Sequence, residues 1–237
     1  MVRDAPDVVV APPSVLRYLA DQKIAIKFRR IVSVAEVLTP LDRATIERYF
    51  QTTVHQFYTS TEGEIAATCE HGTLHLNEEI MVVEKEWIDE ERTMFHPIIS
   101  DFKRKTQPMI RYRQNDILVL SKEPCPCGDA RQAIAEILGR QDDVFEFEST
   151  SGNKELVVPD LIRRATMGLH SGITAYMVEQ VSPSNIVVQL QPHLPNLDFS
   201  GFEQLWEAKE IVPPQISVET YDFTPSATKM RRISKRF

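Results

Sequence analysis

Residues 6–58 read PDVVVAPPSVLRYLADQKIAIKFRRIVSVAEVLTPLDRATIERYFQTTVHQFY, and this stretch decides the fold class. Its apolar, β-branched runs predict short buried strands at 8–10 and 30–34 and a third strand at 54–58. Between them, Ser14 is a natural cap for a helix that runs to about Gln22. Pro40 opens a second helix, with Ile46 on its apolar face. Strand, helix, strand, helix, strand is typical of parallel α/β architecture.

The pattern changes twice further along the chain. Apolar runs joined by charged connections between residues 65 and 120 predict a β-rich segment with antiparallel character. After the polar stretch 139–143, two helices and several strands predict an α+β unit whose small sheet is antiparallel. We therefore expect one domain at 1–139, with its β-rich part at 65–139, and a second at 140–237.

Composition limits the function classes. The chain has 237 residues, of which 42% are hydrophobic and 26% charged, as in ordinary globular proteins. A net charge of −7 argues against general binding of nucleic acid or of an anionic membrane surface. No apolar run approaches the ~20 residues of a membrane helix, and the first residues do not match a signal peptide. We expect a cytoplasmic protein.

Three short polar motifs occur in a fixed order: Tyr58-Thr59-Ser60-Thr61-Glu62, Arg111-Tyr112-Arg113-Gln114-Asn115-Asp116 and Gly139-Arg140-Gln141-Asp142-Asp143. Together they resemble the adenylate-forming enzymes, the acyl- and aryl-CoA ligases and their relatives. The segments 67–76 and 124–128 are most similar to the branch that contains phenylacetate-CoA ligase and coenzyme F390 synthetase. The resemblance implies the C-terminal part of the large adenylation domain, followed by a small mobile α+β domain.

The resemblance also implies roles for the first two motifs. Tyr58 would flank adenine, Thr61 would contact the α-phosphate, and Glu62 would position Mg²⁺ through its carboxylate oxygens. Asp116 would accept hydrogen bonds from the ribose hydroxyls. Read without the family, the first motif is a polar loop after a strand. The arginines of the second motif fit a solvated strand face with ion pairs.

Other family roles fall on residues outside these two motifs. Arg140 would lie near the ribose and phosphate, and Asp142 would be the hinge within 140–143. Lys229 would enter the site and stabilise the phosphate charge. The chain would pass the adenine at Ala35 and Glu36. The alternatives are an ordinary polar linker, a solvated basic tail and a buried strand end.

The chain departs from the family pattern in two of these segments. Gln114-Asn115 stands where Thr-Gly is usual, and Ala227-Thr228-Lys229 where Ser-Gly-Lys is usual. Asn tolerates left-handed backbone better than most residues, which favours survival of the first turn.

All three cysteines fall in the β-rich segment, and their odd number argues against a disulfide framework. Cys69, Cys125 and Cys127 with His75 make a Cys₃His set, a known tetrahedral arrangement for structural zinc. His71 is the alternative imidazole. Unrelated thiols beside a surface histidine remain the simpler interpretation.

The sequence lacks the Ser/Thr/Gly-rich loop with which adenylate-forming enzymes bind ATP phosphates; its eight glycines are scattered. Two functions follow. One is the C-terminal part of an ATP-dependent, AMP-forming ligase that activates a carboxylic acid as an acyl-adenylate and passes it to CoA or another thiol. Its partners would be the acid, ATP and a missing N-terminal half. The other is a non-catalytic, zinc-stabilised nucleotide- or partner-binding module. The sequence leaves the oligomeric state open.

Overall fold

The computed structural model of the protein describes residues 6–222 and 230–237, and the chain divides into two compact units. Unit 1 comprises residues 1–137 and 225–230, and unit 2 comprises 138–224 and 231–237. Within the described ranges no helix is long and apolar enough to cross a membrane.

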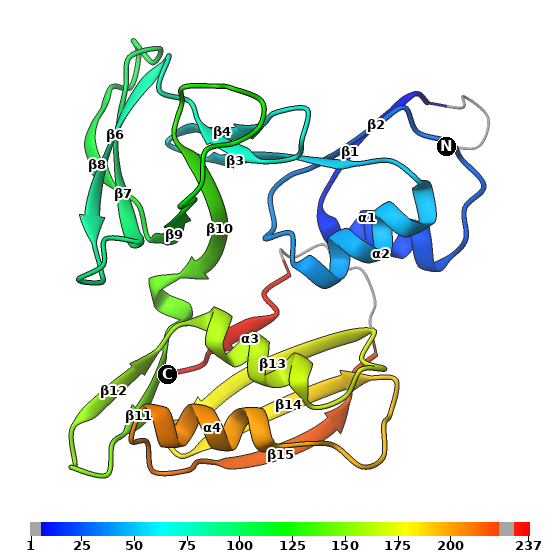
Figure 1. The fold of residues 1–237 in the computed structure, drawn as a ribbon, viewed down its shortest axis with the longest axis vertical. Helices are drawn as coiled ribbons and strands as arrows, with labels where there is room; N and C mark the ends of the chain where they lie inside the picture. The colour runs from blue at the N-terminus through cyan, green and yellow to red at the C-terminus, as the bar shows by residue number, and fades with distance from the viewer. Residues whose placement is uncertain (1–5, 223–229) are drawn as a thin grey trace. The chain divides into compact units, whose positions relative to one another are not determined.

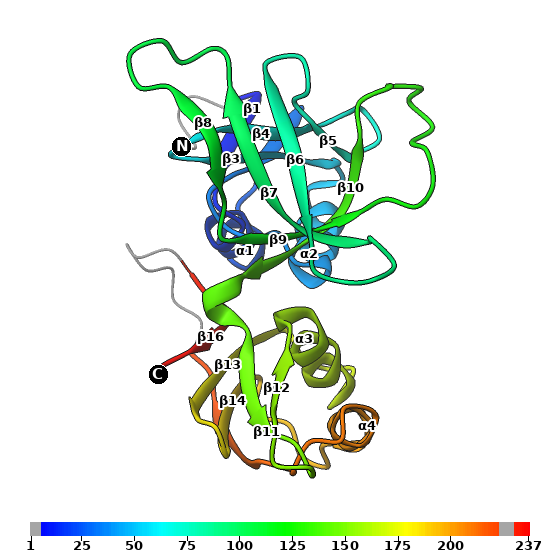
Figure 2. The same ribbon diagram turned by 90° about the vertical axis from the view of Figure 1, so that its left-hand side faces the viewer.

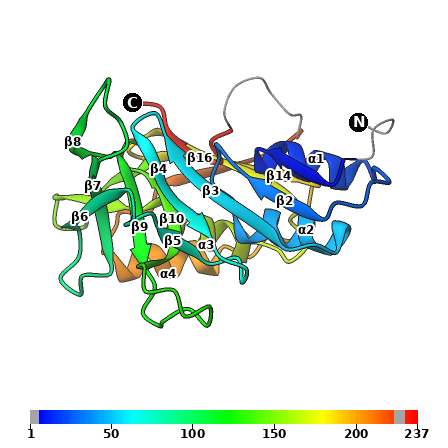
Figure 3. The same ribbon diagram turned by 90° about the horizontal axis from the view of Figure 1, so that it is seen from above.

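Unit 1 is built on a ten-stranded sheet with two helices on one face of its first three strands (Figure 1). Its elements are β1 (Val8–Ala11), α1 (Pro13–Asp21), β2 (Arg30–Ser33), α2 (Pro40–Phe50), β3 (Val54–Ser60), β4 (Gly63–Thr68), β5 (Leu74–Leu76), β6 (Met81–Trp87), β7 (Met94–Asp101), β8 (Met109–Arg113), β9 (Asp116–Leu120) and β10 (Ala133–Arg140). The strand order is β1-β2-β3-β4-β5-β10-β9-β7-β6, and β8 pairs with β7. Figure 3 shows β2, β3 and β4 side by side.

The parallel α/β start and the antiparallel continuation are confirmed. β1, β2 and β3 are parallel. Strand β4 is antiparallel to β3 and β5, and the pairs β5–β10, β6–β7, β7–β8 and β7–β9 are antiparallel too. Helices α1 and α2 bury Leu16, Ile46 and Phe50 against Ile31 and Val54 of the strands. Full burial of such side chains stabilises the fold by about 1.5–3 kcal/mol each.

Two details of this segment were wrongly predicted. The first strand is not buried, because β1 is the terminal strand of the sheet and leaves Val8 and Val10 exposed. Ser14 does not cap α1, because the helix begins one residue earlier at Pro13. The second helix begins as expected, with Thr39 accepting a hydrogen bond from the backbone N–H of Asp42 and Pro40 in the first turn.

A buried ion pair joins the two helices of unit 1. The Arg17 guanidinium on α1 lies 3.1 Å from the Asp42 carboxylate on α2, and both side chains are at most 5% exposed. Asp42 also accepts a hydrogen bond from the Thr39 hydroxyl at 2.8 Å. These contacts fix α1 against α2.

The segment 94–113 forms two strands where we expected charged connections. β7 pairs with both β6 and β8, as Figure 2 shows. Arg111 and Arg113 of β8 form ion pairs with Glu84 and Glu86 of β6. The predicted solvated face with ion pairs is thus present.

Unit 2 packs two helices against a four-stranded sheet. Its elements are a 3₁₀ turn (Gln141–Asp143), β11 (Phe145–Glu148), β12 (Lys154–Val157), α3 (Pro159–Gly168), β13 (Ala175–Ser182), β14 (Asn185–Gln191), α4 (Ser200–Ala208), β15 (Gln215–Thr220) and β16 (Ile233–Lys235). The strand order is β15-β14-β13-β16. β13 and β14 form an antiparallel hairpin, but β15 and β16 each add in parallel, so the sheet is mixed and not antiparallel as expected.

Candidate functional site

The first two sequence motifs meet in unit 1. Tyr58 lies near the end of β3 and Asp116 begins β9, 58 positions further on. The Tyr58 hydroxyl donates a hydrogen bond to the Asp116 carboxylate at 2.5 Å. The backbone carbonyl of Asp116 lies 2.9 Å from a ring nitrogen of His96. Strand β9 therefore holds this carboxylate against the aromatic residue of the first motif.

Thr61 and Glu62 form the two-residue turn between β3 and β4. Burial alone would raise the pKa of Glu62. Hydrogen bonds from Ser60, from its own backbone and from Gln114 and Tyr112 outweigh burial, so the pKa is lower than usual. The carboxylate is therefore ionised near neutral pH, which is the form that binds Mg²⁺. The turn is closely packed, because a Cβ on Gly63 would lie 3.1 Å from the Met81 methyl group.

The segment in which this chain departs from the family pattern is well ordered. Gln114 is buried, and its backbone N–H donates to the Pro97 carbonyl at 2.8 Å. In the described part of this motif, the left-handed residue is Arg111 (φ 49) and not Asn115. The argument that Asn115 would preserve a left-handed turn is therefore wrong: the strand irregularity lies on β8 instead.

Ala35 and Glu36 follow β2, and Tyr58 stands near the end of the adjacent parallel strand β3. The carboxyl ends of parallel strands share one edge of a sheet, where α/β proteins bind ligands. Ala35 has φ 69, an unfavourable conformation for a residue with a side chain. The Glu36 carboxylate accepts hydrogen bonds from the backbone N–H and hydroxyl of Ser14, which ties this loop to the start of α1.

The third motif opens unit 2. Arg140 ends β10, and Asp142 lies exposed in the 3₁₀ turn that follows. Asp143, which sequence reasoning did not single out, is buried and forms an ion pair with Arg231 at 3.3 Å. Lys229 lies outside the described residues.

The three cysteines and His75 form a compact cluster in unit 1. Their ligand atoms all lie within 4.8 Å of one another. The Cys69 and Cys125 sulfurs are 3.7 Å apart, and the Cys127 sulfur is 3.5 Å from Nε2 of His75. His71, the alternative imidazole, is not in the cluster.

The protonation of the cluster is uneven, because the pKa values of Cys125 and Cys127 shift in opposite directions. Nδ1 of His75 lies 3.0 Å from the Arg131 carbonyl, which leaves Nε2 facing the sulfurs, as in many histidine–zinc sites. Hydrogen bonds from Thr73 and from the backbone of Cys127 lower the pKa of Cys125 to about 6. The backbone N–H of Asp129 lowers the pKa of Cys127, but burial and the Cys125 sulfur outweigh it and raise the pKa to about 11. Four such ligands fit tetrahedral zinc and would fill its coordination shell.

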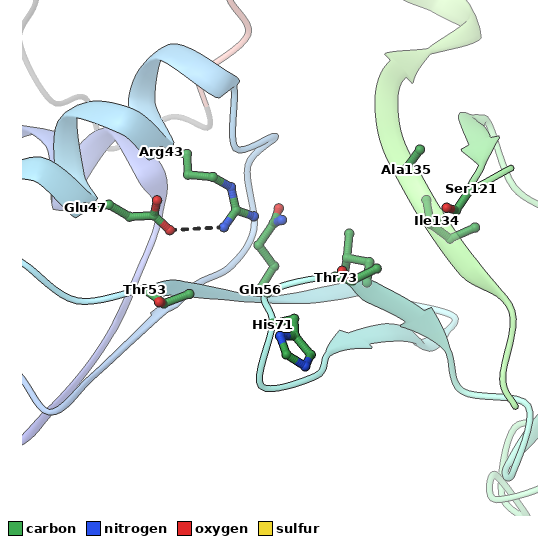
Figure 4. A pocket seen from close by; sticks show the side chains of 11 residues that line it. Arg43, Glu47, Thr53, Gln56, His71, Thr73, Ser121, Ile134 and Ala135 are labelled. Atoms are coloured by element: carbon green, nitrogen blue, oxygen red, sulfur yellow. Dashed lines mark hydrogen bonds and ion pairs between the residues drawn. The ribbon is translucent and has the colours of Figure 1, made fainter. Parts of the chain in front are cut away.

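A polar hollow of about 610 Å³ lies beside residues 71–73, in the loop that leads from Cys69 to β5 (Figure 4). Arg43 and Glu47 of α2 form an ion pair at its rim, and Gln56 of β3 extends toward Arg43. The described residues of its lining are Arg43, Glu47, Thr53, Gln56, His71, Gly72, Thr73, Leu74, Ser121, Ile134 and Ala135, and none belongs to the predicted nucleotide set. Because Glu47 neutralises Arg43, the hollow offers no strong attraction for a phosphate.

Comparison with known proteins places the fold. No protein-family model matches the chain. Protein CapK of Staphylococcus aureus is 28% identical over 180 residues, which are 74% of this chain and 39% of CapK. The chain therefore spans about two fifths of that relative's length.

Solved structures match nearly the whole chain. A 2-hydroxyisobutyryl-CoA ligase, in the postadenylation state with an acyl-AMP, has a TM-score of 0.72 at 16% identity, covering 98% of this chain and 55% of that chain. Coronafacic acid ligase from Pectobacterium brasiliense has a TM-score of 0.60 at 14% identity, with 94% and 48% covered. The adenylation domain of a Mycobacterium chelonae carboxylate reductase has a TM-score of 0.58 at 15% identity, covering 93% of this chain and 42% of that chain.

Proposed function

We propose that the chain supplies the C-terminal half of an ATP-dependent, AMP-forming ligase, because its fold matches about half the length of several solved acyl-adenylate-forming ligases. In the reaction, the carboxylate of an organic acid attacks the α-phosphorus of ATP, and pyrophosphate leaves. A thiol such as CoA then attacks the acyl carbon of the acyl-adenylate and releases AMP.

One observation carries this proposal: the hydrogen bond between Tyr58 and Asp116, which joins two motifs that are 58 positions apart. An aromatic ring beside a carboxylate is suited to a nucleoside, because the ring can stack on the base and the carboxylate can accept both ribose hydroxyls. In this role Asp116 binds the ribose and Tyr58 flanks the adenine. Ala35 and Glu36 border the adenine from β2.

The phosphate chemistry falls to other residues. Thr61 donates to the α-phosphate, and the ionised Glu62 carboxylate in the same turn holds Mg²⁺, which offsets phosphate charge when bound. Arg140, at the end of β10, binds near the ribose and phosphate. Lys229, which lies outside the described residues, stabilises the charge that develops there. Asp142, exposed in its turn, is the hinge of a mobile domain at 140–237.

The Cys₃His cluster supports a structural zinc site. With four protein ligands it leaves no open position for catalysis, so its role is to hold β5 and the 121–132 segment together. The ligand set is Cys69, His75, Cys125 and Cys127.

A second function is favoured by the missing Ser/Thr/Gly-rich loop. Without the donors of that loop, this chain alone would bind AMP and not turn over ATP, as a zinc-stabilised nucleotide-binding module would. In both cases we propose small-molecule partners, joined in the first by the missing N-terminal half. The net charge of −7 disfavours nucleic acid, and we propose a cytoplasmic location.

Nucleotide titration tests the proposal. The full chain should bind AMP in isothermal calorimetry, and Asp116→Ala should weaken binding by about 10- to 150-fold, since a hydrogen bond to a charged group contributes about 1.5–3 kcal/mol. Exposed Asp7→Ala, outside the proposed site, is the matched control and should leave AMP affinity unchanged. Absence of AMP binding by the wild-type chain would refute the nucleotide site. Exchange of pyrophosphate into ATP by this chain alone would refute the module alternative.

A further inference from the structure

Two of the three cysteines begin similar backbone turns in unit 1. The backbone N–H of Gly72 donates to the Cys69 carbonyl at 3.0 Å, and the N–H of Gly128 donates to the Cys125 carbonyl at 3.1 Å. Both glycines have a positive φ, 77 and 74, which glycine adopts without strain. Cys69 and Cys125 therefore hold the same first position in two turns, and the hydrogen bonds that close these turns involve no sulfur.

The sulfurs of these two cysteines face each other. They lie 3.7 Å apart, so the distance has to shorten by roughly 1.7 Å to reach the ~2.0 Å of a disulfide bond. Small rotations of the two side chains are enough for such an approach, whereas the backbone turns stay as they are. The pair is therefore placed for a covalent cross-link.

The third cysteine is engaged differently. The Cys127 sulfur lies 3.5 Å from Nε2 of His75 and accepts the backbone N–H of Asp129 at 3.5 Å. Only Pro126 separates it from Cys125, and the proline ring fixes φ there. Because a disulfide requires a specific geometry, a bond between Cys125 and Cys127 would distort their shared turn. This favours Cys69 as the partner of Cys125.

The sulfurs are open to small reagents. All three cysteines are partly exposed, whereas His75 is fully buried. Oxidation of cysteine follows its exposure and its thiolate character, and cysteines that bind a metal are thiolates. An oxidant as small as a peroxide therefore reaches the sulfur side of the cluster and not its imidazole.

A disulfide between Cys69 and Cys125 would enclose the same part of the chain as zinc does. Strands β5 to β9 all lie between these two cysteines. The entropy that a cross-link removes from the unfolded chain depends on the number of residues in the closed loop. In this relation the disulfide and the metal are equivalent, so one replaces the other without loss of the constraint.

We infer that Cys69 and Cys125 form a reversible oxidation site, at which a peroxide converts the zinc-bound thiolates to a disulfide that replaces the metal as the cross-link of unit 1. The inference rests on the zinc site of the proposed function. In a reducing compartment the zinc form is the resting state. A thiol such as glutathione returns the disulfide to two cysteines.

The oxidation needs no group besides the two sulfurs and the peroxide. One thiolate attacks an oxygen of hydrogen peroxide, the O–O bond breaks and hydroxide leaves, which gives a sulfenic acid. The second thiolate attacks that sulfur, so the S–S bond forms, the S–O bond breaks and a second hydroxide leaves. The two sulfurs lose two electrons to the peroxide. Zn²⁺ loses two of its four ligands and dissociates, and both hydroxides take protons from the solvent.

Peroxide treatment of the zinc-loaded full chain tests the exchange. A chromogenic chelator measures released zinc, and peptide mapping without reduction locates the disulfide. We expect one zinc released for each bond between Cys69 and Cys125, and dithiothreitol with added zinc should reverse both changes. In the chelated chain, Cys127→Ser should still form this bond, because it keeps the pair. Cys125→Ser should lose it.

Urea unfolding tests whether the disulfide replaces the metal as a cross-link. With Trp206→Phe, fluorescence reports Trp87, which belongs to unit 1. Oxidation of the chelated chain should restore most of the roughly 2 M by which chelation lowers the unit 1 midpoint. Cys69→Ser is the matched control, because it exposes the remaining thiols to the same peroxide and should recover nothing.

Three outcomes would overturn the inference: sulfinic or sulfonic acid as the main product, a disulfide mainly between Cys125 and Cys127, or an oxidised chain whose midpoint stays at the chelated value. Full zinc occupancy that peroxide does not disturb also refutes only this inference. Formation of the disulfide in a wild-type chain that holds no zinc refutes the zinc site and leaves the oxidation site standing. The nucleotide site is tested separately by AMP binding.

Discussion

Removal of zinc from the Cys₃His cluster should destabilise unit 1 and leave unit 2 unchanged. The cluster joins the chain at Cys69 to the chain at Cys125, which are 56 positions apart. A bound metal closes this loop much as a cross-link does. The chain-entropy relation for a cross-link of that length gives about 4 kcal/mol. This is a large share of the roughly 5–15 kcal/mol that stabilises a typical domain.

The two tryptophans let each unit be followed separately. Trp87 belongs to unit 1 and packs against the Phe95 core, whereas Trp206 belongs to unit 2. Urea unfolding in a Trp206→Phe background therefore reports unit 1, and a Trp87→Phe background reports unit 2. A chelator should lower the unit 1 midpoint by roughly 2 M, for a slope of about 2 kcal/mol per M.

Cys125→Ser should reproduce the effect of the chelator and reduce bound zinc, measured by mass spectrometry of the purified protein, to well below one per chain. His71→Ala is the matched control, because His71 is close in sequence but outside the cluster. It should keep both the zinc and the midpoint. Substoichiometric zinc in the wild type, or equal loss of stability in both units on chelation, would refute the reasoning.

Three further predictions concern stability. Asp42→Ala should destabilise the Trp87 transition by about 3–5 kcal/mol, because it leaves the buried Arg17 guanidinium without its closest partner on α2; a loss below 1 kcal/mol would show that Asp21 suffices. Ala35→Gly should raise the free energy of unfolding of unit 1 by roughly 0.5–1 kcal/mol, since glycine tolerates φ 69. A decrease would contradict the backbone strain at Ala35. Lys154 and Lys235 lower the pKa of Glu146 below its ordinary 4.5. The stabilisation of unit 2 by these ion pairs is therefore complete above about pH 4.5 and is lost as the pH falls through the lowered pKa of Glu146 in the folded state. Glu146→Gln should therefore flatten the acid limb of the Trp206 unfolding profile, and an unchanged limb would contradict it.

Local patterns in the sequence were enough for the start of the fold. Strands β1 to β3 and both helices follow from apolar runs and caps that lie within a few residues of one another. The grouping of the three cysteines followed from residue types, and His75 was preferred to His71 for its place in a strand and in the resembled branch. The structure brings those four side chains together. That zinc occupies the cluster remains a prediction.

Long-range contacts explain what the sequence could not reveal. The segments 94–101 and 109–113 become strands because β7 pairs with β6 and β8 pairs with β7. Arg111 and Arg113 also meet carboxylates on β6. The parallel addition of β16 to β13 depends on Val178 meeting Ile233. Likewise, the contact of Glu36 with Ser14 spans 22 positions, so no local pattern shows it.

The position of β5 in the sheet has a consequence for synthesis on the ribosome. The outer edge of β5 pairs with β10, where His75 lies opposite Ala133. At about 5–20 residues per second, the 58 positions between these residues take about 3–12 s to be translated. During that interval the edge of β5 and the Cys69 thiol are without their later partners. The nascent chain is therefore most exposed to mispairing and oxidation in these seconds, and slower translation past residue 76 would lengthen them.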